Sequence, residues 1–177
     1  EVSRSLAACD GALLIIDAAQ GIEAQTLANL YLAINNNLTI IPVINKIDLP
    51  NADIDKVTNE IVDVLGFKKE DIILCSGKTG QGVKELLDAI VLRIPAPIVN
   101  NEDKTRALIF DSYFDSYRGV IVSVKVDTGK IKVKDRIRLM ATGATYEVVE
   151  LGVNTPKEKK LNELTSGQVG WINASIK

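Results

Sequence analysis

The sequence predicts an α/β unit followed by an all-β unit, and three observations support this division. Over residues 1–94, short apolar runs alternate with segments whose apolar residues recur every three to four positions, which is typical of parallel strands joined by helices. Residues 95–104 hold two prolines and then a polar stretch, as linkers do. Over residues 105–177 the apolar period changes to two and turn residues separate the runs, which predicts a small antiparallel β-barrel.

The first unit is expected to contain three strands and four helical stretches. Asp53 is the expected N-cap of a helix that stops at Gly66, because aspartate accepts bonds from the first turn and glycine adopts left-handed geometry after the last. The apolar spacing also predicts the inward face of each helix. The expected strands are residues 12–16, 39–44 and 72–75; the expected helices are 1–9, 22–35, 52–65 and 83–93; and the expected inward residues of the second and fourth helices are Leu27, Leu30, Tyr31, Ile34, Leu86, Leu87, Ile90 and Val91.

Helical crossovers between these strands predict a right-handed parallel sheet covered by helices, as part of a three-layer α/β/α half-domain. Three strands are few for this architecture. The strand edge from Leu13 to Ile16 is therefore expected to stay open and to drive self-association through strand pairing.

The second unit is expected to contain five short strands. Lys157 to Lys160 is charged throughout and is expected to form a loop. Trp171 alternates with Gly170 and Ile172, which places it in the barrel core or at its rim rather than on a stacking platform. The expected strands are residues 106–114, 120–126, 136–140, 145–151 and 168–176.

Composition is that of an ordinary globular protein, with 46% hydrophobic and 25% charged residues in 177. No apolar run approaches the roughly 20 residues of a membrane span. Cys9 and Cys75 sit among apolar neighbours, so buried free thiols are expected rather than a disulfide. The sequence has no histidine, so a zinc site or a histidine general base is not expected. These features favour the cytosol.

Charge divides along the same boundary as the fold. Residues 1–104 carry 9 Lys and Arg against 15 Asp and Glu, a net charge of −6, whereas residues 105–177 carry 12 against 8, a net charge of +4. The second unit is therefore better suited to meet phosphates, although a solvated basic face is the alternative.

A guanine-recognition motif is indicated by residues 39–50, where an apolar strand ends in Asn45-Lys46-Ile47-Asp48. Ligands of open α/β sheets bind at the carboxyl ends of strands. The two carboxylate oxygens of Asp48 match the adjacent N–H donors of guanine, whereas adenine offers an acceptor there and would leave polar groups unpaired. Asn45 can bridge base and loop, and the Lys46 stem can lie across the purine. The alternative is a surface turn.

A second loop thirty residues later strengthens this interpretation. Strand 72–75 is followed by Ser76-Gly77-Lys78. Gly77 lets a backbone N–H approach the guanine O6, Lys78 can cover the opposite face of the base, and Ser76 can brace Asp48 or its own loop. The alternative is a glycine-rich turn before the next helix. Asp17 ends the first strand, where a hydrogen-bonding role is expected rather than metal binding.

The sequence contains no G-x-x-x-x-G-K-[S/T] phosphate loop and no separate D-x-x-G. A nucleotide enzyme needs phosphate and Mg²⁺ contacts for chemistry. The chain is therefore expected to be either a binding module or a piece of something longer.

Several segments resemble the LepA (elongation factor 4) family of translational GTPases. Residues 1–29 are similar to the segment after the second switch, and the N-K-I-D and S-G-K motifs follow in the family's order. F-D-S-Y-F-D-S-Y-R-G-V at residues 110–120, L-G-V-N-T-P-K at 151–157 and S-G-Q-V-G-W-I at 166–172 agree. The family usually has alanine where Gly77 stands, which is mild because the contact is through the backbone.

The resemblance implies a P-loop-NTPase-type half-domain, then a translation-factor barrel, in a fragment cut at both ends. It implies a ribosome-dependent GTPase proposed to promote back-translocation, with GTP or GDP and Mg²⁺ as cofactors of the full-length protein and no tightly bound cofactor here. It also implies a cytoplasmic protein, peripheral on the membrane in some settings. The fragment alone is expected to bind nucleotide weakly and to be inactive. A stand-alone ribosome- or RNA-binding module with a degenerate G domain, the related translocase and a ribosome-protection protein are the alternatives.

In that scheme the barrel docks against ribosomal RNA of the small subunit. Aromatic residues stack on bases and arginine forks onto phosphate, so several side chains are candidates. A core position for one of the tyrosines Tyr113 and Tyr117, and a solvated face for the basic residues, are the alternatives. The candidate contacts are Tyr117, Arg118, Lys125, Arg136 and Arg138.

Overall fold

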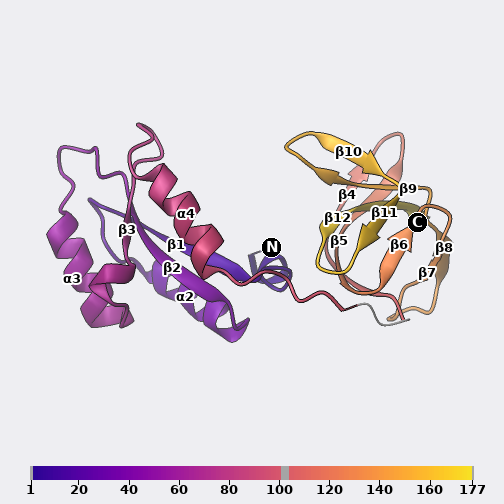
Figure 1. Ribbon diagram of the computed structural model, residues 1–177, viewed down its shortest axis with the longest axis horizontal. Helices are drawn as coiled ribbons and strands as arrows, with labels where there is room; N and C mark the ends of the chain where they lie inside the picture. Colours follow the sequence, from indigo (N-terminus) through magenta and orange to yellow (C-terminus); the bar gives the residue numbers. More distant parts are fainter. Residues whose placement is uncertain (1, 101–103, 177) are drawn as a thin grey trace. The chain divides into compact units, whose positions relative to one another are not determined.

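The chain forms two units in the computed structural model, which describes residues 2–100 and 104–176 (Figure 1). One unit comprises residues 9–96 and is the α/β part. The other comprises residues 97–176 and groups with residues 2–8, which include the short helix α1 (Val2–Leu6). This helix is shorter than the expected 1–9, and Glu1 lies outside the described residues. No helix in the described part of the chain is long and apolar enough to cross a membrane.

A three-stranded parallel sheet is the centre of the α/β unit, as predicted. Its strands are β1 (Gly11–Asp17), β2 (Thr39–Asn45) and β3 (Ile73–Leu74), in the order β1-β2-β3. The helices that connect and follow these strands are α2 (Ala24–Asn35), α3 (Ile54–Leu65) and α4 (Val83–Arg93), with a 3₁₀ turn at Lys69–Asp71 before β3.

Apolar side chains project from both faces of this sheet and form two separate clusters, one on each face. Leu14, Ile16 and Ile44 pack with residues of α2 and α3. Ile41 and Val43 pack with Ala89 of α4 and its neighbours. Helices therefore cover both faces, which confirms the predicted three-layer arrangement.

The end signals of α3 act as the sequence indicates, whereas the inward faces of α2 and α4 were only partly predicted: Leu30, Leu86 and Ile90 pack inward as expected. Asp53 accepts a hydrogen bond from the N–H of Lys56 at 3.0 Å, and Gly66 follows with φ +75°. In α2 and α4, the small residues Ala33 and Ala89 are buried instead of four larger ones. Small side chains let a helix backbone approach the sheet, and the larger residues beside them turn outward. The residues predicted inward but exposed are Tyr31, Ile34, Leu87 and Val91.

The two cysteines form no disulfide, but only one has the expected burial. Cys75 is buried beside the second sheet face, whereas Cys9 is exposed. Cys9 lies in the connection between α1 and β1, outside either apolar cluster, so its apolar sequence neighbours did not determine its environment.

The second unit is a β-barrel built around a single apolar cluster that includes Val124, Leu151, Leu164 and Ile172. Five strands form one sheet in the order β10-β9-β12-β5-β4, and the pairs β11-β6 and β7-β8 complete the wall. The strands are β4 (Arg106–Asp115), β5 (Gly119–Thr128), β6 (Lys130–Lys132), β7 (Arg136–Arg138), β8 (Thr145–Glu147), β9 (Glu150–Asn154), β10 (Glu158–Leu161), β11 (Glu163–Thr165) and β12 (Val169–Ile176).

Three details of the barrel differ from the sequence prediction. The expected strand 145–151 is divided into β8 and β9, and β6 and β11 were not predicted. The charged segment expected as a loop at 157–160 is strand β10, which pairs with β9 at the edge of the sheet. An edge strand that is mostly exposed shows no alternation, and charged side chains there protect the edge. Trp171 is buried, 2% exposed, but it alternates with Ile172 and is not part of the apolar cluster.

Candidate functional site

The predicted guanine-recognition residues meet at the carboxyl end of the parallel sheet. Asp17 and Asn45 are register partners at the ends of β1 and β2, and Ile44 is paired with Leu74 of β3. The loops that leave β2 and β3 therefore begin side by side. This edge is where an open α/β sheet binds ligands.

The loop after β2 has an unusual backbone that spreads its side chains in two directions. Lys46 has φ +65°, in the left-handed region, which non-glycine residues rarely adopt. The N–H of Leu49 bonds to the carbonyl of Lys46 at 3.1 Å and closes a turn around Ile47 and Asp48. Ile47 packs against the apolar cluster and fixes the loop to the unit.

Ser76 connects the two loops through its hydroxyl. The side chain is fully buried, and its Oγ donates to Oδ1 of Asp48 at 2.6 Å. The same Oγ accepts the N–H of Thr79 at 3.1 Å, which shapes the loop after β3. Both bracing roles expected of Ser76 are therefore present.

Asn45 makes a second connection between the loops. Its Oδ1 accepts the N–H of Gly77 at 3.1 Å and lies 3.7 Å from the thiol sulfur of Cys75. In this structure the Gly77 N–H, which we expect to approach a purine, therefore donates to Asn45. Its role toward the guanine O6 stays a prediction.

Electrostatics keep Asp48 ionised. The pKa of its carboxyl is below the usual value, first because of the hydrogen bond from Ser76 and also because of the positive charge of Lys78, whose side chain is exposed. An ionised carboxylate is an acceptor at both oxygens. With Oδ1 holding the Ser76 hydroxyl, lone pairs on both oxygens remain for a ligand with adjacent N–H donors.

A contact that the sequence analysis did not predict joins Asp17 to Lys46. Oδ2 of Asp17 lies 2.7 Å from Nζ of Lys46, while Oδ1 accepts the N–H of Ala19 at 2.8 Å. The hydrogen bonds within the loop agree with the role expected of Asp17. The ion pair could have been predicted only from the pairing of strands, because Asp17 ends β1 and Lys46 directly follows the end of the adjacent strand β2.

In the barrel, Tyr117 and Arg118 have opposite environments. Tyr117 lies at the turn between β4 and β5 and is 97% exposed. The Arg118 guanidinium forms ion pairs with Asp115 at 3.1 Å and Glu158 at 2.9 Å, and lies 5.5 Å from the ring centre of Trp171. These contacts occupy the guanidinium, so Arg118 joins two hairpins of the barrel; its contact with RNA stays a prediction.

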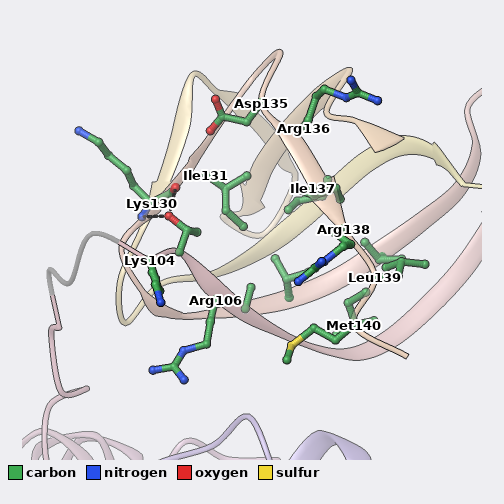
Figure 2. Close-up of a pocket in the computed structure, with 16 residues that line it drawn as sticks. Lys104, Arg106, Lys130, Ile131, Asp135, Arg136, Ile137, Arg138, Leu139 and Met140 are labelled. Carbon is green, nitrogen blue, oxygen red and sulfur yellow. Dashed lines mark hydrogen bonds between the residues drawn. The ribbon is translucent and has the colours of Figure 1, made fainter. Parts of the chain in front are cut away.

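Arg136 and Arg138 lie on β7 with both side chains exposed, as predicted, and border a cavity of about 900 Å³ (Figure 2). In the close-up, Arg136 points away from the cavity and Arg138 reaches along it. Lys125 alternates with buried valines of β5 and does not line this cavity, and its grouping with the two arginines stays a prediction. The basic residues that line the cavity are Lys104, Arg106, Lys130, Arg136 and Arg138.

The chain is similar to known proteins in sequence over its whole length. Residues 1–96 match the family described as elongation factor Tu GTP binding domain. Elongation factor 4 of Mesoplasma florum is 60% identical over 178 residues, and that of Exiguobacterium sibiricum is 56% identical over 177; each match covers all of this chain. The chain spans 30% and 29% of the length of these two relatives.

Solved structures agree on the fold. The translation elongation factor SelB of Methanococcus maripaludis in its apo form has a TM-score of 0.77 and 24% identity, over 94% of this chain and 37% of that one. A bacterial selenocysteine-specific elongation factor EF-Sec has a TM-score of 0.77 and 20% identity, over 97% of this chain and 30% of that one. At these identities the likeness concerns the fold alone.

Proposed function

Because the chain belongs to the elongation factor Tu GTP binding domain family, we propose that it is the guanine-recognising segment and barrel of a ribosome-dependent translational GTPase of the elongation factor 4 type. In this proposal residues 1–94 are the second half of a GTP-binding domain, residues 95–104 the linker and residues 105–177 most of a second domain. The whole protein hydrolyses GTP to GDP and phosphate during protein synthesis.

The observation that carries the proposal is the double connection between the loops after β2 and β3. Ser76 holds Asp48 at 2.6 Å, and Asn45 holds the backbone of Gly77 at 3.1 Å. These two bonds fix an ionised carboxylate at the edge of the sheet before any ligand binds. A preorganised acceptor costs little to align on binding, which favours both affinity and selectivity.

Selection of guanine follows from the donors and acceptors of the two purines. The Asp48 carboxylate accepts from N1–H and the exocyclic amine of guanine. Adenine presents a bare N1 acceptor to the same oxygens, so binding it would desolvate Asp48 without replacement bonds. The stems of Lys46 and Lys78 cover the two faces of the base in this proposal.

The residues at this edge do not fit Mg²⁺. A Mg²⁺ ion takes oxygen ligands in near-octahedral geometry. Here Asp17 is ion-paired with Lys46, and Asp48 is held by Ser76 and directed to the base. The chain by itself is therefore proposed to bind GDP or GTP weakly, through base contacts, and to hydrolyse neither.

The barrel is proposed to meet ribosomal RNA of the small subunit. Tyr117 is exposed at a turn, where a base can stack on it, and Arg136 and Arg138 are exposed on β7 beside further basic side chains. The protein is proposed to work in the cytoplasm, with membrane association as a peripheral property.

The proposal is tested by nucleotide binding to the complete protein. We expect calorimetry to give a far lower Kd for GDP than for ADP, and Asp48→Ala to remove that difference. Equal affinity for the two nucleotides would refute guanine recognition. In the 177-residue chain alone, a submicromolar Kd for GDP would contradict the weak binding proposed for it.

A further inference from the structure

The two charged residues of the loop after β2 point to opposite neighbours in the sheet. With the strand order β1-β2-β3, Lys46 reaches the end of β1 and Asp48 reaches the loop after β3. A base bonded to Asp48 has the Lys46–Asp17 pair on its β1 side. The proposed function uses Lys46 and Asp48 but gives no role to Asp17.

Asp17 is held in one orientation by its own loop. Its Oδ1 accepts N–H groups from Ala19 at 2.8 Å and Gln20 at 3.3 Å. The backbone of the same loop is joined to the base-recognition loop by the N–H of Ala18, which donates to the carbonyl of Asn45 at 2.9 Å. Ala18 is fully buried. The remaining oxygen, Oδ2, is thus presented to Lys46 from a fixed position.

Lys46 needs such a fixed partner. Its backbone is in the left-handed region and its side chain is 55% exposed, so neither helical geometry nor packing orders the four-carbon stem. Ordering a free lysine side chain costs conformational entropy. The Asp17 carboxylate, whose side chain is only 15% exposed, orders it before a ligand arrives.

We propose that Asp17 is a positioning residue for guanine nucleotides, which holds the Lys46 stem along one face of the purine through the ion pair at 2.7 Å. This inference rests on the proposed function. Asp17 touches no nucleotide atom and acts through Lys46. The pKa of Asp17 is lowered, first by the bond to Lys46, and that of Lys46 is raised by the same partner, which agrees with a formed pair.

The substitution Asp17→Asn separates the ion pair from the loop. The amide oxygen of asparagine still accepts the N–H groups of Ala19 and Gln20, whereas the charge that holds Lys46 is lost. Asp63→Asn is the matched control, because Asp63 is exposed near the far end of α3 and its substitution removes the same charge.

The experiment is a double-mutant cycle on the complete protein, with GDP as the ligand and calorimetry as the measurement. Asp17→Asn should raise the Kd about three- to fivefold, as expected for a partly exposed ion pair. Asp63→Asn should leave it unchanged. Adding Asp17→Asn to Lys46→Met should have no further effect, because the residue through which Asp17 acts is already gone.

A second readout needs no nucleotide. Nuclear magnetic resonance of the lysine ammonium groups should show the pKa of Lys46 falling toward its ordinary value in Asp17→Asn. An unchanged pKa would overturn the proposal, and so would an equal loss of GDP affinity in the Lys46→Met background, which would indicate a structural role. If wild-type protein bound no GDP at all, the proposed function would fail, and this inference with it.

Discussion

Replacing Gly77 with alanine tests the geometry of the base-recognition loop directly. Gly77 is not among the glycines with positive φ, so an L-residue fits its backbone. A Cβ built there meets only Oδ1 of Asn45, at 3.8 Å, which is ordinary van der Waals contact. The N–H that Asn45 holds is unaffected by the substitution. We therefore expect alanine to stabilise the loop.

The magnitude follows from the unfolded chain. Replacing glycine by alanine at a compatible site stabilises a protein by about 0.4–1 kcal/mol, because the unfolded state loses conformational freedom. For a unit the size of residues 9–96 this corresponds to a rise in Tm of roughly 2–8 °C. The Kd for GDP should stay the same or fall, since the loop has less freedom to lose on binding.

The assay is thermal unfolding followed by circular dichroism at a helix-sensitive wavelength. In the described residues, every helix longer than α1 belongs to the α/β unit, and Trp171 fluorescence reports the barrel as an internal reference. Gly82→Ala is the matched control. Gly82 has φ +71°, and a Cβ there would overlap the carbonyl oxygen of Leu74, so this variant should be strongly destabilised. A lower Tm for Gly77→Ala would refute this geometry of the Gly77 loop.

Three further outcomes are expected. In the complete protein, Asp48→Asn should weaken GDP binding about tenfold or more and shift preference toward xanthine nucleotides, because the amide donates to the additional carbonyl of xanthine. Calorimetry with GDP and with the xanthine nucleotide measures the ratio of the two Kd values. An unchanged ratio would exclude Asp48 from guanine recognition. The pKa of Glu158 is lowered, first by its bond from Arg118. Its contribution to stability is therefore complete above the unfolded pKa of about 4.3 and is lost as pH falls through the lowered folded value. Arg118→Met should reduce this loss of stability at acid pH, measured by a Trp171 fluorescence titration. An identical pH dependence in the variant would count against the Arg118–Glu158 ion pair. Ile15 is 57% exposed on the edge strand β1, so the wild-type chain should self-associate and Ile15→Lys should not; equal molar masses by light scattering at high concentration would rule out this edge.

Much of the α/β unit could be predicted because its local signals agree with one another. The strands β1 and β2, the N-cap Asp53 and the stop at Gly66 were predicted within a few residues. Which helix side turns inward could not be predicted in full. The apolar stripes of α2 and α4 are wide, and packing against the sheet determines that the small residues Ala33 and Ala89 within these stripes are buried.

The barrel shows a similar limit. Strands with alternating apolar residues, such as β5 and β12, were predicted, whereas the edge strand β10 has charged residues on both faces and no periodic signal. Its pairing with β9 determines its conformation. The same holds for Arg118, whose partner Glu158 lies forty residues away in the sequence.

The sequence by itself determined the chemistry available for guanine recognition. A carboxylate, an amide, a serine and two lysines lie at or shortly after the ends of apolar runs. Both the propensity for a strand and the position of its end can be predicted from neighbouring residues. Only the tertiary structure decided which of these side chains contact one another. Parallel pairing put Asp17 beside Lys46 and Ser76 beside Asp48, because strand order brings together chain segments that no local pattern relates.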